Sequence, residues 1–152
     1  KVAFLRLADA LAAPAALTVA LCRLAEGLAD EGWGWDLETW FDPYGGMSLL
    51  PGGDASAFSF FPLAHYRASW GTWHWAVYVL EAVLALGICL VLLRAAAKRP
   101  GDTFGLLLLL YAASQILCES MRQDSVLRWG FVRSSQMISA AVVLGLQLLW
   151  TL

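Results

Sequence analysis

Four polar side chains near the end of one apolar segment follow a helical spacing. Tyr111, Gln115, Glu119 and Arg122 are separated by four, four and three residues, which places them on one face of a helix. Ionisable groups at the edge of a membrane are costly, so they usually point into a helix bundle or a water-filled cavity. Arginine suits a phosphate, because its planar fork matches phosphate oxygens. The stripe therefore indicates either a binding site for a phospholipid headgroup or a polar network that only fixes helix packing.

Two charged residues in other segments are candidates to join this stripe. Arg23 ends the first apolar segment, and Glu81 lies roughly 12 Å into another at 1.5 Å per residue, where it needs a partner or a proton. Arg23 or Arg122 is the expected partner, because both lie toward the same side of the membrane as Glu81. Taken alone, Arg23 is more typical of an arginine that reaches from a helix end to the headgroups, with Glu26 and Glu31 solvated behind it.

The composition predicts that these residues are positioned by membrane helices. Of 152 residues, 60% are hydrophobic and only 14% are charged, against roughly 25% charged in an average soluble domain. We expect a single all-α, polytopic integral membrane domain over 1–152. Its four crossings are expected at about 5–22, 73–94, 103–121 and 134–152, each near the ~20 residues that a spanning helix needs. Gln136 begins the last of them and can form hydrogen bonds across helices.

The charges between these segments predict the orientation. Three basic residues lie in the short connection at 94–99, and basic connections usually face the cytoplasm. Four crossings then place both termini inside and residues 23–72 outside, as an acidic, aromatic-rich loop on the outer membrane surface. The connection at 120–133 also lies outside although it contains three arginines, which indicates that these arginines have an anionic partner.

Several functional classes lack support in the sequence. The net charge of −2 argues against binding of nucleic acid, which needs a basic face. The three cysteines lie in apolar segments at no metal-ligand spacing, and neither His65 nor His74 belongs to a metal motif, so no metal is expected. No hydrolase or phosphate-loop motif is present. We expect no signal peptide, and the start at Lys1 leaves room for upstream residues.

Three patches of the chain resemble the prolipoprotein diacylglyceryl transferase family. The family signature is roughly R-x-G-N-F-x-N-x-E-x-x-G, and RLAEGLADEGWG at 23–34 keeps its Arg, Glu and last Gly. The family pattern Y-G-x-x-R-F-x-x-E-x-x-R corresponds to YAASQILCESMR at 111–122, and G-Q-x-x-S corresponds to the stretch SQMIS at 135–139. Glu81 matches the glutamate of a further family segment, H-P-x-x-L-Y-E. The likeness covers the last four of the family's seven spans.

The chain also departs from the family pattern. Gln115 stands where the family has an arginine considered essential, and Glu26 stands where the signature has an asparagine. The family's upstream His-Gly-Gly segment has no counterpart within these residues.

The resemblance implies transfer of a diacylglyceryl group from phosphatidylglycerol to a cysteine thiol of a lipoprotein precursor, with glycerol phosphate as the leaving group. Residues that it assigns to catalysis are Arg23, Tyr111, Glu119 and Arg122. Residues that it assigns to substrate binding are Glu26, Glu31, Gly34, Glu81, Gln115 and Gln136. The two arginines would hold the lipid phosphate, while Glu31, Glu81 and Glu119 would orient them. The outer aromatic loop would receive the peptide.

The resemblance further implies the partners and the location. The partners would be phosphatidylglycerol, the cysteine region of the prolipoprotein signal peptide and membrane lipid, with no cofactor. The location would be the bacterial cytoplasmic (inner) membrane, with the polar site on the extracytoplasmic side. Two other hypotheses stay open: a non-catalytic homologue that binds anionic phospholipid or lipoprotein precursor, and an unrelated small membrane subunit.

Overall fold

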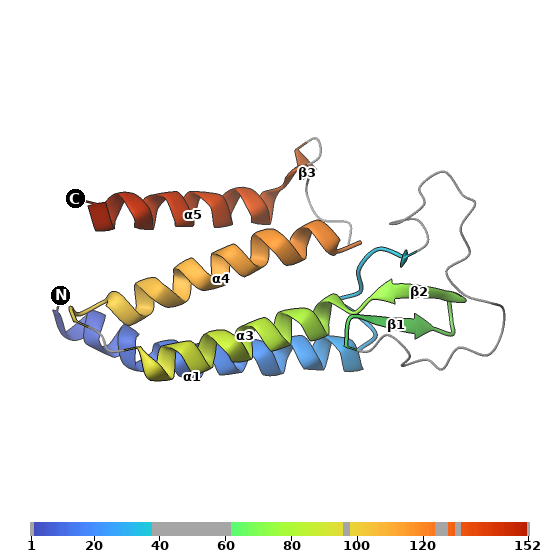
Figure 1. The fold of residues 1–152 in the computed structure, drawn as a ribbon, viewed down its shortest axis with the longest axis horizontal. Coiled ribbons are helices and arrows are strands. Elements are labelled where there is room, and N and C mark those ends of the chain that lie inside the picture. Colours follow the sequence, from blue (N-terminus) through green and yellow to red (C-terminus); the bar gives the residue numbers. More distant parts are fainter. Residues whose placement is uncertain (1, 38–61, 96–97, 124–127, 130–131, 152) are drawn as a thin grey trace.

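Four long helices run side by side and alternate in direction (Figure 1). The computed structural model describes residues 2–37, 62–95, 98–123, 128–129 and 132–151. The helices are α1 (Val2–Leu28), α3 (Val77–Arg94), α4 (Asp102–Met121) and α5 (Ser134–Thr151). Both chain ends lie at one end of the bundle, and the strands lie at the other (Figure 1). The predicted all-helical membrane architecture is confirmed.

Three helices are long and apolar enough to cross a membrane: Phe4–Leu28, Val77–Arg94 and Asp102–Met121. Within α5, the stretch Ser134–Leu148 is a shorter apolar helix, so the fourth crossing stays a prediction. Two boundaries differ from the expected spans. The first helix continues to Leu28 instead of ending near residue 22, and the second begins at Val77, because residues 72–75 form a strand.

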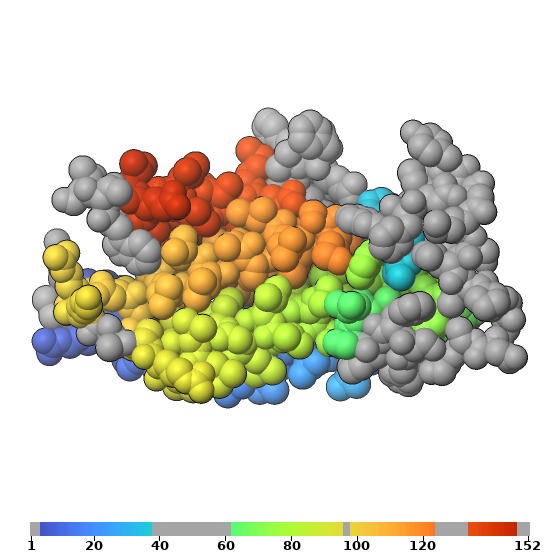
Figure 2. Space-filling view, viewed as in Figure 1, coloured from blue at the N-terminus to red at the C-terminus, as the bar shows by residue number. Residues whose placement is uncertain are grey.

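Small residues allow α1 to lie close along α3. Ala12, Ala16 and Ala20 are buried and spaced four apart, so they form one stripe on α1. Such stripes let membrane helices approach closely, because lipid supplies no hydrophobic drive for helices to associate. Pro14 does not end this helix, and the Thr18 hydroxyl donates a hydrogen bond to its carbonyl oxygen at 2.9 Å. Figure 2 shows α4 between α3 and α5 on the viewed face.

An acidic residue of the first helix connects it to α4. The carboxylate of Asp9 accepts hydrogen bonds from the backbone N–H groups of Gly101 (2.7 Å) and Phe104 (2.9 Å). The first N–H groups of a helix have no partner inside the helix, and their partial positive charge favours an anion. In the sequence, Asp9 is a charged residue inside the first apolar segment, with no visible partner. In the structure, its carboxylate links α1 to the start of α4, at the end of the bundle where the termini lie.

Short strands build the opposite end. The strands β1 (Ala64–Arg67) and β2 (Thr72–Trp75) form an antiparallel hairpin, and β3 (Arg128–Trp129) pairs with β4 (Val132–Arg133). These hairpins were not predicted from the sequence. Much of the expected outer loop, residues 38–61, lies outside the described part of the chain.

The segment after α1 joins the first hairpin to the end of α4. Gly34 donates its N–H to the carbonyl of Trp75 at 2.8 Å and forms a β-bridge with Arg122, while Trp35 donates to the carbonyl of Met121 at 2.9 Å. A Cβ on Gly34 would lie 2.6 Å from both the Met121 oxygen and the Trp75 Cβ. Only glycine fits between these two elements, which explains the glycine at this signature position.

We predict that Gly34→Ala destabilises the protein by about 1–3 kcal/mol, because the new methyl group collides with the Met121 carbonyl oxygen and with the Trp75 side chain. Thermal unfolding of purified protein in detergent measures this change. The matched control is Gly87→Ala, at a helical glycine whose Cβ position has no neighbour within 4 Å. Equal melting temperatures for the two variants would contradict the proposed close approach.

Candidate functional site

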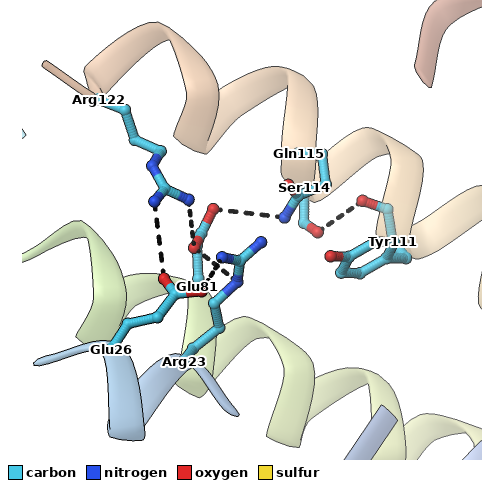
Figure 3. A network of polar contacts seen from close by, with 7 residues as sticks. All are labelled: Arg23, Glu26, Glu81, Tyr111, Ser114, Gln115 and Arg122. Carbon is cyan, nitrogen blue, oxygen red and sulfur yellow. Dashed lines mark hydrogen bonds and ion pairs between the residues drawn. The ribbon is translucent and has the colours of Figure 1, made fainter. Parts of the chain in front are cut away.

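Two arginines and two glutamates from three elements form one network of ion pairs (Figure 3). Glu81 Oε2 lies 2.9 Å from Arg23 Nε and 3.5 Å from Arg122 Nη1. Glu26 also pairs with both arginines: its Oε1 lies 2.6 Å from Arg23 Nη1, and its Oε2 lies 3.6 Å from Arg122 Nη2. Each carboxylate therefore contacts both guanidinium groups. The predicted pairing of Glu81 with Arg23 or Arg122 is confirmed for both arginines.

The elements described above bring these four side chains together. Arg23 and Glu26 are three residues apart on α1, so they share a face, and Glu81 lies in the second turn of α3. Arg122 follows the end of α4 in extended conformation, and its backbone is held by the bridge to Gly34. Glu81 is only 3% exposed, and an ionised carboxylate at such a position needs paired charges.

The two arginines differ in their access to a pocket. Arg23 lies 2.6 Å from Glu26 and 2.9 Å from Glu81, and Arg122 lies 3.6 and 3.5 Å from the same two carboxylates. Arg122 also lines an open pocket next to the network. Arg122 is therefore the guanidinium better placed to meet an anionic ligand.

The rest of the predicted stripe lies along α4 beside this network. Gln115 donates a hydrogen bond to Glu81 Oε1 at 3.4 Å, and the hydroxyl of Tyr111 is turned toward the Arg23 guanidinium (Figure 3). Glu119 is buried on the same helix. Gln136 lies apart from the network: it donates to the carbonyl of Ile116 at 3.2 Å and so joins α5 to α4.

A pocket of about 430 Å³, called the outer pocket after the side of the membrane on which it is predicted to lie, adjoins the network. Its lining residues are Asp30, Glu31, Gly32, Trp33, Arg67, Trp70, Arg122 and Gln123. Glu31, expected to orient the arginines, lines this pocket together with Arg122 and has an exposed side chain. The pocket combines charged side chains with the rings of Trp33 and Trp70.

The sequence reasoning missed Arg67, a buried cation of this pocket. Its Nη2 lies 2.5 Å from Asp30 Oδ2, and its guanidinium carbon lies 4.0 Å from the ring centroid of Trp70 and 5.0 Å from that of Trp33. A basic residue among tryptophans in an otherwise acidic segment was the available signal. Asp30, at φ 61°, adopts the left-handed conformation that aspartate tolerates better than most residues.

The histidines of the first hairpin have structural partners. His74 Nδ1 lies 3.1 Å from the Gly34 carbonyl oxygen, and its Nε2 lies 2.8 Å from the Thr72 hydroxyl. Burial lowers the pKa of His74, so the ring stays neutral at physiological pH. His65 stacks on Trp33. In the described part of the chain, no group of three His, Cys, Asp or Glu side chains is arranged to hold a metal.

A small apolar pocket lies on the membrane side of the network. It measures about 90 Å³, and it is lined by Ala15, Ala16, Val19, Ala85, Ile88, Leu107, Leu108 and Tyr111. Tyr111 therefore has its ring at an apolar crevice and its hydroxyl at the charged cluster. This combination of cations next to an apolar crevice suits an amphiphile with an anionic headgroup.

Comparison with known proteins adds two matches. The family described as prolipoprotein diacylglyceryl transferase matches residues 1–152. A protein of Symbiobacterium thermophilum named phosphatidylglycerol–prolipoprotein diacylglyceryl transferase is 44% identical over 68 residues. That stretch is 44% of this chain and only 25% of the relative. No solved structure matches significantly.

We predict that Glu81→Ala destabilises the fold by about 3–5 kcal/mol, because it removes the buried carboxylate that pairs with both arginines and leaves Glu26 to compensate the two cations. Glu31→Ala, at an exposed carboxylate, serves as the control and should change stability by less than about 0.5 kcal/mol. Chemical denaturation in detergent compares the two. A Glu81 variant as stable as the Glu31 variant would show that the buried network does not hold the helices together.

Proposed function

This chain belongs to the prolipoprotein diacylglyceryl transferase family, and from that premise we propose that it transfers the diacylglyceryl group of phosphatidylglycerol to a cysteine thiol of a lipoprotein precursor. The observation that carries the proposal is Arg122, a guanidinium that belongs to a buried charge network and also lines an open pocket. The residue types at the site fit a phospholipid whose phosphate approaches from the outer end of the helices.

On this proposal, the polar headgroup of the lipid and its apolar chains would lie in two different environments. The phosphate would lie at Arg122, with Arg23 behind it, since guanidinium groups match phosphate oxygens. The glycerol backbone and an acyl chain would extend past Tyr111 toward the apolar crevice between α1, α3 and α4. The headgroup and only the first part of a hydrocarbon chain would then contact the site at the same time.

The proposed reaction is a substitution at carbon. The sulfur of the precursor cysteine attacks C3 of the diacylglyceryl group, a C–S bond forms, and the bond from C3 to the phosphate oxygen breaks. Glycerol phosphate leaves with the electron pair, and the thiol proton passes to it or to water. The phosphate gains negative charge during this step. Arg122 and Arg23 would stabilise that charge, and Glu81 would keep both guanidinium groups in position.

We propose that this site faces the outside of the bacterial inner membrane. The basic residues Arg94, Lys98 and Arg99 lie at the opposite end of the bundle, which the positive-inside rule assigns to the cytoplasm. The precursor cysteine would approach from the aromatic outer region, where the hairpin of β1 and β2 lies.

We predict that Arg122→Ala lowers transfer by about 10²–10³-fold, the typical effect of removing a group that stabilises developing charge. The assay mixes purified protein with phosphatidylglycerol and a peptide containing the precursor cysteine, and follows release of glycerol phosphate. Arg94→Ala, at the cytoplasmic end, is the matched loss of one arginine and should leave the rate nearly unchanged. Equal losses in both variants would contradict the proposed site.

A specific observation favours a second function, lipid binding without turnover. Arg23, Arg122, Glu26 and Glu81 sum to zero charge, and Glu26 and Gln115 stand where the family pattern has asparagine and arginine. Each of these two differences lowers the charge of the cluster by one unit. A neutral cluster attracts a phosphate less strongly than one with an excess of guanidinium groups.

We predict that the double variant Glu26→Asn, Gln115→Arg binds phosphatidylglycerol at least about tenfold more tightly, because it adds two units of positive charge at the site. Binding to vesicles that contain phosphatidylglycerol measures this, and release of glycerol phosphate shows whether turnover also changes. Turnover by the double variant but not by the natural sequence would establish the non-catalytic alternative. Unchanged affinity would show that this cluster does not face the lipid phosphate.

A further inference from the structure

We propose that the outer pocket binds the glycerol phosphate unit of the lipid headgroup, and that Arg67 excludes headgroups that carry an amine. The inference rests on the proposed function, which it deepens by assigning headgroup selectivity to residues outside the ion-pair network. The ligand chemistry is a phosphate ester of glycerol, as part of the intact lipid or as the free product.

Arg67 occupies the place where a cationic headgroup would bind. Its guanidinium lies over the ring of Trp70 at 4.0 Å and near that of Trp33 at 5.0 Å, and aromatic faces arranged in this way recognise ammonium groups such as choline. Asp30, the nearest carboxylate, is already paired with the same arginine. An ethanolamine or choline group that approached these two rings would therefore meet a cation instead of an open aromatic face.

The remaining groups of the pocket suit a neutral polyol next to a phosphate. Arg122 supplies the charge for the phosphate, and the exposed carboxylate of Glu31 can accept hydrogen bonds from hydroxyl groups. Gln123 also lines the pocket, and a hydroxyl group both donates and accepts, so a hydroxyl of a glycerol headgroup can pair with an amide side chain there.

The position of the pocket fits the headgroup glycerol that we assign to it. Arg122 borders the pocket and contacts Glu81 in the network, so a phosphate at this arginine has the pocket on one side and the helix bundle on the other. The headgroup glycerol would lie in the outer pocket while the diacylglyceryl group lies toward Tyr111. The volume of about 430 Å³ is within the range of small-molecule sites and leaves space beside the headgroup.

Lipid competition on the intact chain tests the role of Arg67. Purified protein in detergent is mixed with equal amounts of phosphatidylglycerol and phosphatidylethanolamine, and native mass spectrometry measures the two adducts. The natural protein should prefer phosphatidylglycerol, and Arg67→Gln should reduce that preference about tenfold, the effect of one cation–π contact in a desolvated site. Arg94→Gln is the matched control and should keep the preference.

A second variant tests the glycerol part independently and does not depend on the buried Arg67–Asp30 pair. Glu31→Ala alters an exposed side chain, and it should reduce the preference for phosphatidylglycerol over phosphatidic acid, which lacks the headgroup glycerol. Free glycerol 1-phosphate, added in a separate arm, should displace phosphatidylglycerol from the natural protein. Its binding without any phosphatidylglycerol adduct would assign the pocket to the released product instead of the lipid.

The outcomes separate this inference from the proposed reaction. Unchanged adduct ratios in both Arg67→Gln and Glu31→Ala would overturn the inference, even if the chain transfers diacylglyceryl groups. Altered ratios in a chain that releases no glycerol phosphate would support the headgroup pocket and contradict the transferase.

Discussion

The structure depends on the burial of one carboxylate, that of Glu81, near the start of the apolar helix α3. A carboxylate removed from water is several kcal/mol less stable unless cations and hydrogen bonds compensate it. The compensating groups come from α1 and from the end of α4, so the same interaction joins three helices and places two guanidinium groups side by side. At the other end, Asp9 joins α1 to the start of α4. Polar contacts at both ends thus hold helices that expose large apolar side chains along their length.

The sequence predicted the parts of this arrangement that follow from helical periodicity. The spacing of Tyr111, Gln115 and Arg122 placed them on one face, and the depth of Glu81 required a cationic partner; the structure joins Gln115 and Arg122 to Glu81. Pairings between distant segments could not be predicted. Four-residue strands such as β1 and β2 are too short to be distinguished from an aromatic segment at the membrane surface, so the Arg67–Asp30 pair was missed. The sequence showed that Gly34 matches the last glycine of the family signature, but not that a side chain there would collide with Met121 and Trp75.

The charged residues of the site stand at the positions that the family pattern gives, but two replacements change the total charge. Arg23, Glu81 and Arg122 match that pattern and meet in the structure, whereas Glu26 and Gln115 replace an asparagine and an arginine. Glu26 engages both arginines, and Gln115 contacts Glu81 as a neutral amide. An incoming phosphate would therefore have to compete with Glu26 for Arg122. On the proposed function, this competition sets the affinity for phosphatidylglycerol, and the outer pocket adds selectivity for its headgroup.

The most direct test of the proposed transferase is the mass of the peptide product. Purified protein would be incubated with phosphatidylglycerol vesicles and a peptide that carries the precursor cysteine, and the peptide would be analysed by mass spectrometry. We predict that the peptide gains one diacylglyceryl group on its cysteine, with an equal amount of glycerol phosphate released, and that a cysteine-to-serine peptide gains none. An unmodified cysteine peptide, recovered from protein shown to be folded and to bind phosphatidylglycerol, would contradict the transferase and support a lipid-binding relative.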